Sequence, residues 1–491
     1  MKPIYFLLFF ALFLILGGIN RGIDISDEGL YALLAHPLQE NQAGIFNYDL
    51  FFKSLYQLTS LHFGLVELRF LRLLGYVAAA LALAIFLKHI SGNKKIQSHD
   101  VLLALFGLFA GYAFLPQSLS YNHLTVGLAC CWLALISGNL HKNQNTLALG
   151  FVLGFLVYVK ITTAIILFFI SVGVFSWKKV PKLNLGLVLL PFLLLELLFF
   201  LGLETSATQR LWYGINLIQA REDYALWTLI KINLVGIYWI GLSFLGSLLA
   251  SKMISSPSLK LLAWVLWCGI LIWFTHITEE WNHVFLLASI PLFVALLTHP
   301  KIHFWESKSR YWILLLGILP ILLHFGSNVY WLRIGIHYWV FWILGLWILA
   351  KELKNFQYEK WMLGLGLITC FLIFMGVWWM PFGQAPLWKN QTPWEYLPEK
   401  SIKLNPEQVQ KLQELEKHEE IQPSIQILAA YRISGIPFLL GKTMPKSPGF
   451  WDQDHLKAYF PDSLPDIPLI YAPSSDFPKP PTNNLILLTE F

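Results

Sequence analysis

Long apolar runs recur from one end of the chain to the other, and they restrict its fold more than any other feature of the sequence. Most are roughly 15 to 22 residues long, about the length that an α-helix needs to cross a hydrocarbon layer roughly 30 Å thick. Short polar loops separate them. We therefore predict an all-α polytopic membrane protein with about thirteen transmembrane helices, at Pro3–Ile19, Leu65–Leu87, Val101–Pro116, Asn122–Ser137, Leu147–Val159, Ile161–Phe175, Leu185–Leu203, Leu229–Ala250, Leu261–Phe274, Val284–Leu297, Tyr311–Phe325, Ile334–Ala350 and Trp361–Met380.

The composition excludes a soluble globular enzyme. Of the 491 residues, 56% are hydrophobic and only 13% are charged, whereas a soluble domain has about 25% charged residues. The net charge of +6 comes from Lys and Arg residues spread over short loops, so we expect a lipid bilayer and no nucleic acid as partner. The four Cys residues lie inside apolar runs without metal-ligand spacing, which supports neither a disulfide framework nor a zinc site.

The distribution of basic residues predicts the topology. One set of alternate loops, together with the N-terminus, carries most of them: Lys2, Lys88, Lys94, Lys95, Lys142, Lys178, Lys179, Lys182, Lys252, Lys260, Lys301, Lys308, Arg310, Lys351, Lys354 and Lys360. The other set carries only Arg21, Lys53, Lys160, Arg210, Arg221 and Arg333. By the positive-inside rule, the N-terminus is cytoplasmic and the C-terminus is outside. One long helix through Lys160 would reverse every later loop, so the alternation favours two helices that meet there.

Two long polar segments fall on the predicted external side. The first is the loop 20–64, which belongs to a transmembrane domain spanning residues 1–380. The second is the segment 381–491, rich in Pro and charge, which we predict to be a small extracytoplasmic α/β domain. Its expected elements are a helix over Asn405–His418, with Val409, Leu412 and Leu415 on one face, and strands at Ser424–Ala430, Pro468–Tyr471 and Leu485–Leu488.

The stretch from Asp24 to Tyr31 is the most informative part of the first loop. Asp24, Ser26 or Asp27 could cap a helix that carries Leu30, Leu33, Leu34 and Leu38 and lies in the membrane interface. Alternatively, carboxylates at the mouth of a membrane bundle form a reaction site, as a base or as ligands of a divalent cation. This segment alone leaves both interpretations open.

Four segments follow one another on the predicted external face: Asp27–Ala35 (DEGLYALLA), Gly64–Gly75 (GLVELRFLRLLG), Gly154–Ala164 (GFLVYVKITTA) and Asn282–Pro291 (NHVFLLASIP). In this order the chain resembles the GT-C superfamily of integral-membrane glycosyltransferases, the group with protein O-mannosyltransferases and lipid A aminoarabinose transferases. The resemblance covers roughly residues 3–380. The chain departs from the family in two places. It lacks the Lys-Pro-Pro sequence that is frequent in the family's first loop, and it has His283 where relatives often carry Arg.

The resemblance implies an inverting transfer, at the outer face of a bacterial cytoplasmic (inner) membrane, from a polyprenyl-phosphate-linked sugar to a lipid, glycan or protein acceptor. Asp27 is the expected base. Glu28 either orients the acceptor or, with Asp27, binds a divalent cation such as Mg²⁺ or Mn²⁺. Cations are needed where the phosphate leaves. For that role we expect Lys160 and Arg72, the latter in preference to Arg69, with His283 as a further contact. For Lys160 the alternative is a side chain that snorkels to water at a helix end.

Further residues on the same face are candidates for substrate binding: Tyr31, Asn122, His123, Arg210, Glu279 and Glu280. Asn122 is equally suited to cap a helix, and Arg210 and Arg221 to be solvated loop charges. Two other functions remain open, a transporter or flippase for a lipid-linked substrate and a non-catalytic envelope scaffold. A transporter should carry charges near the bilayer midplane, where Glu196 is the one obvious carboxylate.

Overall fold

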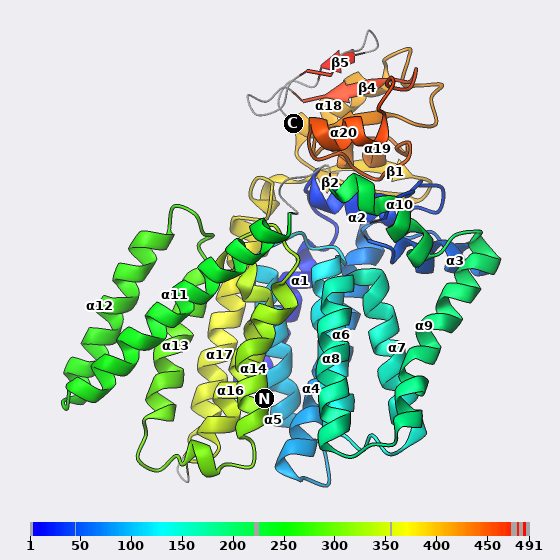
Figure 1. Ribbon diagram of the computed structural model, residues 1–491. Coiled ribbons are helices and arrows are strands. Elements are labelled where there is room, and N and C mark those ends of the chain that lie inside the picture. Colours follow the sequence, from blue (N-terminus) through cyan, green and yellow to red (C-terminus); the bar gives the residue numbers. More distant parts are fainter. Residues whose placement is uncertain are drawn as a thin grey trace.

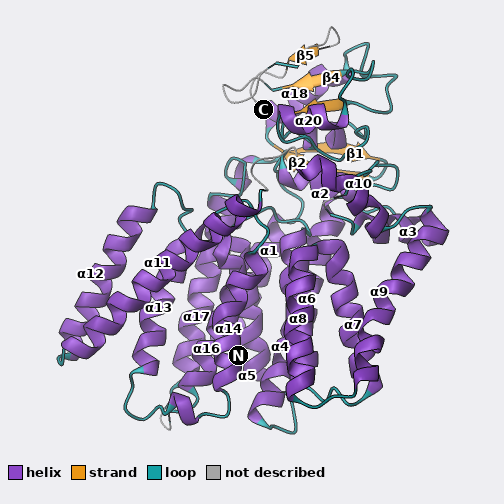
Figure 2. Cartoon of the chain, in the orientation of Figure 1, coloured by secondary structure: helices purple, strands orange, loops and turns teal. Residues whose placement is uncertain are grey.

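A computed structural model describes residues 3–44, 46–219, 225–353, 356–472, 479–480 and 485–487. Figure 1 shows a bundle of helices with a smaller part stacked on one end, and the strands lie only in that smaller part (Figure 2). The helices of the bundle are α1 (Pro3–Gly18), α4 (Leu65–Ser91), α5 (Ser98–Phe109), α6 (Tyr121–Ser137), α7 (Asn143–Val159), α8 (Ile161–Trp177), α9 (Lys182–Leu203), α11 (Leu226–Met253), α12 (Pro257–Thr275), α13 (His283–Leu297), α14 (Arg310–His324), α15 (Trp331–Ile334), α16 (Trp339–Ala350) and α17 (Tyr358–Ile373).

Each predicted transmembrane segment overlaps one of these helices. Within the described residues, 6 helical stretches are long and apolar enough to cross a membrane: Leu65–Ser91, Leu183–Leu203, Leu226–Met253, Pro257–Thr275, Trp331–Ala350 and Tyr358–Trp379. The remaining bundle helices are apolar but only 10–17 residues long. The structure is thus that of a helical protein suited to a membrane, and the number of thirteen spans stays a prediction.

The predicted helix break at Lys160 is confirmed. Helix α7 ends at Val159 and α8 begins at Ile161, while Lys160 between them has the extended dihedrals φ −156° and ψ 95°. A further deviation from regular α-helix lies near the same end of the bundle. The 3-10 helices η1 (Ala110–Ala113) and η4 (Gly335–Tyr338) extend α5 and link α15 to α16, and they pack against each other.

The loop 20–64 folds into two short helices, α2 (Asp27–Ala35) and α3 (Asp49–Thr59). Helix α2 lies between the bundle and the C-terminal part (Figure 1), and all its residues from Glu28 to Ala35 are buried. This burial does not fit the interpretation of a helix whose apolar face lies in the membrane interface. Leu38, expected on the apolar face, lies beyond the end of the helix and is 67% exposed.

The C-terminal part contains the predicted helix and the three predicted strands. Its elements are β1 (Thr392–Leu397), β2 (Lys400–Leu404), α18 (Pro406–Glu416), β3 (Leu428–Ala430), α19 (Gly435–Leu439), α20 (Gln453–Tyr459), β4 (Leu469–Tyr471) and β5 (Leu485–Leu487). Strands β3, β4 and β5 form a parallel sheet in that order. The antiparallel hairpin of β1 and β2 was not predicted.

The C-terminal part shares its hydrophobic core with the loop 20–64. One buried cluster joins Leu33 of α2 and Leu68 of α4 to Leu412 and Ile436 of the C-terminal part. Two glycines permit a close approach, because a Cβ atom on Gly29 would lie 2.1 Å from the backbone nitrogen of Gly435. This packing brings residues from the far end of the sequence to the start of α2.

Candidate active site

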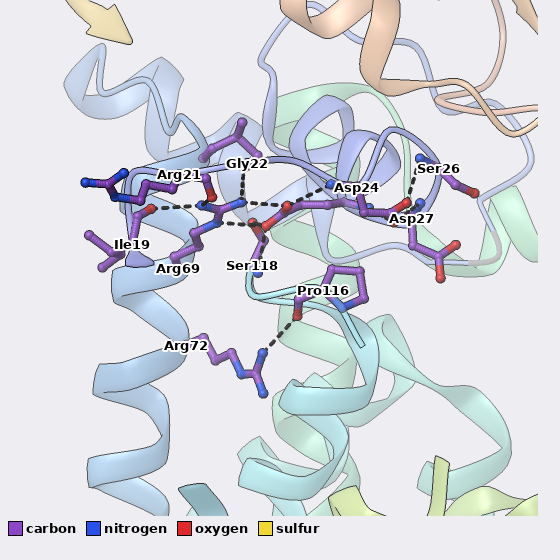
Figure 3. A network of polar contacts seen from close by, with 12 residues as sticks. Ile19, Arg21, Gly22, Asp24, Ser26, Asp27, Arg69, Arg72, Pro116 and Ser118 are labelled. Atoms are coloured by element: carbon purple, nitrogen blue, oxygen red, sulfur yellow. Dashed lines mark hydrogen bonds and ion pairs between the residues drawn. The ribbon is translucent and has the colours of Figure 1, made fainter. Parts of the chain in front are cut away.

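Asp24 caps the N-terminus of α2. Its Oδ2 atom accepts hydrogen bonds from the backbone N–H groups of Asp27 (2.7 Å) and Glu28 (3.1 Å), and its Oδ1 atom accepts one from Ser26 (3.2 Å) (Figure 3). Burial, together with the nearby Asp27 carboxylate, raises the pKa of Asp24 well above its usual value. Of the three residues considered as caps, Asp24 therefore fills the role.

Glu28 is enclosed by hydrogen-bond donors. Arg69 binds both of its oxygens, from Nε to Oε1 at 2.9 Å and from Nη2 to Oε2 at 2.7 Å. The Oε1 atom also accepts bonds from the hydroxyl and the backbone N–H of Ser118, at 2.6 and 3.0 Å. Burial alone would raise the pKa of Glu28, but Arg69 holds it below its usual value. This set of partners fixes α2 against α4 and leaves Glu28 little capacity for an acceptor or a metal ion, the roles predicted for it.

Asp27 differs from both of these neighbours. Its carboxylate takes no part in the capping bonds, and Figure 3 shows it pointing away from the Asp24 and Arg69 network. The side chain is partly exposed. Burial raises the pKa of Asp27 to about 6, and the positive charge of Arg432 opposes this rise. A carboxylate of this kind can accept a proton near neutral pH.

Aromatic side chains line the neighbourhood of Asp27. Tyr31, one helical turn further along α2, packs edge-on against Tyr121 with 6.4 Å between ring centroids, and Phe46 stacks on Tyr121 at 4.3 Å. Burial, reinforced by the Asp27 carboxylate, raises the pKa of Tyr31 well above its usual value, so its hydroxyl stays neutral. Trp451 lies beside Arg432, at 5.9 Å from the guanidinium carbon to the ring centroid. Such side chains combine an apolar face with a polar group that can hydrogen-bond.

Lys160 lies next to this aromatic cluster, because the preceding Val159 packs in the same group as Tyr31. Its Nζ atom donates to the carbonyl oxygens of Leu323 (2.7 Å) and His324 (3.2 Å) at the end of α14. Lys160 is only 8% exposed, so snorkelling to water does not describe it. Its amino group thus binds two of the orphan carbonyls of a helix C-terminus. A role in phosphate binding stays a prediction.

Arg72 is fully buried one turn deeper in the bundle than Arg69. It donates to the carbonyl oxygens of Pro116 (2.8 Å) and Gly111 (3.0 Å), and its guanidinium carbon lies 3.7 Å from the ring centroid of Tyr112. Figure 3 shows it below Pro116, apart from the Glu28 network. The geometry therefore points to Arg69 as the arginine that organises α2, whereas Arg72 was expected to lie nearer the site.

The candidates at the start of α6 lie beside Arg72. His123 packs against His337, with 4.8 Å between ring centroids, and its Nδ1 atom lies 2.9 Å from the hydroxyl of Ser120. Ser120 thus occupies the capping position that was expected for Asn122. The Oδ1 atom of Asn122 is buried and has no hydrogen-bond partner among the described residues.

The predicted residues around His283 lie elsewhere. Figure 1 places the ends of α12 and α13 at one side of the bundle, away from α2. Both ring nitrogens of His283 are engaged, Nε2 with the Thr275 hydroxyl at 2.8 Å and Nδ1 with the Glu280 carbonyl at 2.7 Å. Glu280 forms an ion pair with Arg333 at 3.0 Å. Burial raises the pKa of Glu279 to about 7. The structure does not bring this group to Asp27, so its part in donor binding has no geometric support.

Arg210 has a structural partner. It belongs to α10 (Ala207–Gln219) and forms a buried ion pair with Asp49 of α3, with Nη1 at 2.7 and 2.9 Å from the two carboxylate oxygens. Neither substrate binding nor a solvated loop charge, the two predicted roles, describes this arrangement. Arg221 lies outside the described residues.

Arg432 is the site residue that sequence reasoning missed. It lies in a turn of the C-terminal part with a left-handed φ of 56°, and no spacing or motif relates it to Asp27.

Among the described residues, no group of three or more His, Cys, Asp or Glu side chains is arranged to hold a metal ion. A scan against models of known protein families and a search of curated proteins give no match for this chain.

Proposed function

We propose that this chain is a membrane glycosyltransferase of GT-C type that acts at the extracytoplasmic face of a bacterial cytoplasmic membrane. The donor is a polyprenyl-phosphate-linked sugar, and the acceptor is a lipid, a glycan or a protein. One observation carries the proposal. Asp24 caps α2 and Glu28 is held by Arg69 and Ser118, so Asp27 keeps a carboxylate that is not committed to these bonds.

The proposed reaction assigns Asp27 as the general base. The acceptor hydroxyl gives its proton to Asp27 while its oxygen bonds to the anomeric carbon. The bond from that carbon to the phosphate oxygen breaks, and polyprenyl phosphate leaves with the electron pair. Inversion follows because the acceptor attacks from the face opposite to the phosphate. A base with a pKa of about 6 is well matched to this step near neutral pH.

Cationic groups are required where negative charge develops on the phosphate. Two such groups flank the aromatic cluster, Lys160 at the break between α7 and α8 and Arg432 from the C-terminal part. In the proposal these two residues take the role for which Lys160, Arg72 and His283 were predicted. The aromatic side chains of Tyr31 and Trp451 belong to one packed cluster, and in the proposal the sugar ring stacks against this cluster.

The carboxylates around Asp27 fit a divalent cation poorly. Glu28 accepts bonds from Arg69 and Ser118, and both oxygens of Asp24 accept backbone N–H groups. This leaves one uncommitted carboxylate, whereas Mg²⁺ sites use oxygen ligands from several groups. The proposed reaction therefore contains no metal step.

The single deep carboxylate considered for a transporter also has a structural role. Glu196 of α9 accepts a bond from the Tyr158 hydroxyl at 2.6 Å and from the backbone N–H groups of Ala207 and Thr208, both at 3.0 Å. It therefore caps α10 from an adjacent helix. A carboxylate held in this way is unsuited to accompany a substrate across the bilayer, which favours the enzyme over the flippase.

A reconstituted transfer assay tests the proposal. Purified protein in proteoliposomes receives a radiolabelled polyprenyl-phosphate hexose and an extract of membrane acceptors, with Asp27→Asn as the test variant. Asp462→Asn, an exposed position in the C-terminal part, is the matched control. We expect transfer by the wild type and by Asp462→Asn, and loss of transfer by Asp27→Asn. Lipid movement across the vesicles without sugar transfer would instead support the flippase.

A further inference from the structure

A large cavity lies at the opposite end of the bundle from Asp27. It has a volume of about 860 Å³ and opens between α11, α13 and α14. Figure 1 shows α11 and α12 leaning away from the other helices. Only 28% of the apolar stretch of α11 and 11% of that of α12 are buried. The cavity therefore adjoins helices whose remaining surface suits contact with lipid tails.

The lining of this cavity combines apolar and ionisable side chains. Apolar side chains form the walls, among them Phe244, Ile290 and Leu314. The lining also includes three ionisable side chains, Lys252 from the last turn of α11, His303, and Glu306 from the 3-10 helix η3 (Phe304–Glu306). Basic and acidic groups thus line an otherwise apolar chamber of the size of a small-molecule site.

We propose that this cavity binds one glycerophospholipid with a zwitterionic headgroup of the phosphatidylethanolamine type. The acyl chain fills the apolar chamber, where it gains dense van der Waals contacts with the side chains of the walls. The phosphate pairs with Lys252 and the ammonium group pairs with Glu306. An anionic headgroup would satisfy Lys252 but would face Glu306 as a like charge, so these two side chains discriminate between the two lipid types.

Gly317 of α14 offers a way to fill the cavity. It lines the chamber, and a Cβ atom added there meets no atom within 4 Å. The Gly317→Phe variant should therefore occupy the chamber without disturbing its neighbours. Gly173→Phe is the matched control, because Gly173 also lies within an apolar helix, has equally open surroundings and does not line the cavity.

Native mass spectrometry of the full chain in detergent, with equal amounts of palmitoyl-oleoyl phosphatidylethanolamine and phosphatidylglycerol, measures the bound lipid. We expect one retained phosphatidylethanolamine in the wild type and in Gly173→Phe, and its loss in Gly317→Phe. Glu306→Gln should remove the preference over phosphatidylglycerol, and Lys252→Gln should weaken the binding of both lipids. Equal retention of the two lipids by the wild type, or unchanged retention by Gly317→Phe, would overturn the proposal.

A photoactivatable phosphatidylethanolamine with a diazirine in its acyl chain locates the bound molecule. Irradiation followed by peptide mapping should label α13 and α14 around Ile290 and Leu314 in the wild type, and this labelling should be lost in Gly317→Phe. Labelling confined to outward-facing helices such as α9, and equal in both proteins, would contradict the assignment to this cavity.

Discussion

Arg69 and Glu28 form a doubly hydrogen-bonded ion pair that is closed to solvent, with N–O distances of 2.9 and 2.7 Å and side chains that are 2% and 0% exposed. Arg69 also donates to the backbone carbonyls of Ile19, Arg21 and Gly22, at 3.0, 2.8 and 2.6 Å. The pair thereby joins the end of α1, the loop 20–64 and α4. It sets the position from which Asp27 faces the aromatic cluster.

Breaking this pair should be costly. In Arg69→Met the charge of Glu28 stays buried without its counter-ion, and we expect a loss of about 3 kcal/mol in the free energy of unfolding. Thermal and denaturant unfolding of the purified protein in detergent measures this loss. The double variant with Glu28→Gln should recover part of it, since no unpaired charge then remains. A loss well below about 1 kcal/mol in Arg69→Met would mean that the pair is solvated and contributes little to the free energy of unfolding.

The capping role of Asp24 predicts a different pattern from a catalytic role. Asp24→Ala should lower the free energy of unfolding by about 1 kcal/mol or more, because three backbone N–H groups at the start of α2 lose their acceptor. Asp24→Asn keeps an acceptor oxygen and should be close to the wild type in stability and in activity. If Asp24→Asn abolished sugar transfer while the protein stayed folded, Asp24 would be the base.

The helical architecture was largely predictable from the sequence, whereas much of the site was not. Apolar runs locate the bundle helices because hydropathy is a local property of the chain. The break at Lys160 and the strands of the C-terminal part also follow from local patterns. The β1 and β2 hairpin was missed, since charged residues in Glu395–Lys403 obscure the alternation.

The partners of the site residues depend on contacts between distant segments. Glu28 is enclosed by Arg69 and Ser118, and the positive charge of Arg432, from the C-terminal part, acts on Asp27. No spacing rule links these positions, so Glu28 was assigned a catalytic role and Arg432 was overlooked. Arg210 was likewise taken as a ligand contact, although its carboxylate partner Asp49 lies more than a hundred residues earlier.

The raised pKa of Asp27 predicts the pH dependence of turnover. The base must be ionised, so the rate of donor consumption should rise with pH through about 6. Stability should change in the opposite sense. Between the ordinary pKa of Asp and about 6 the folded state binds more protons than the unfolded state, so ionisation of Asp27 destabilises the fold as pH rises. Asp27→Asn should therefore gain stability relative to the wild type above pH 6 and not below pH 4. A pH–rate profile and paired unfolding curves measure both effects.

Arg432 should set the position of that pH profile. Its positive charge opposes the rise in the pKa of Asp27, so Arg432→Gln should move the rising limb of the profile to higher pH. Arg432→Lys retains the charge and is the matched control. An unchanged midpoint, or a shift to lower pH in Arg432→Gln, would show that Arg432 does not act on Asp27.

The contact between Gly29 and Gly435 should hold the C-terminal part on α2. In Gly29→Ala the new Cβ would meet the Gly435 backbone at 2.1 Å, and backbone atoms cannot move aside as a flexible side chain can. We expect lower stability and faster cleavage of the C-terminal part in limited proteolysis. Gly75→Ala in α4 is the matched control because nothing lies within 4 Å of its added Cβ. Equal cleavage rates in the two variants would contradict the packing described here.

The role of Asp27 as base is tested most directly by single-turnover release of polyprenyl phosphate, with enzyme in excess over donor and a saturating acceptor. Asp27→Asn preserves the size of the side chain and removes its ability to take a proton. The predicted result is release at least about 100-fold slower than in the wild type, the usual contribution of a general base, with donor binding and folding retained. Release at the wild-type rate by a folded Asp27→Asn protein would contradict the proposed mechanism.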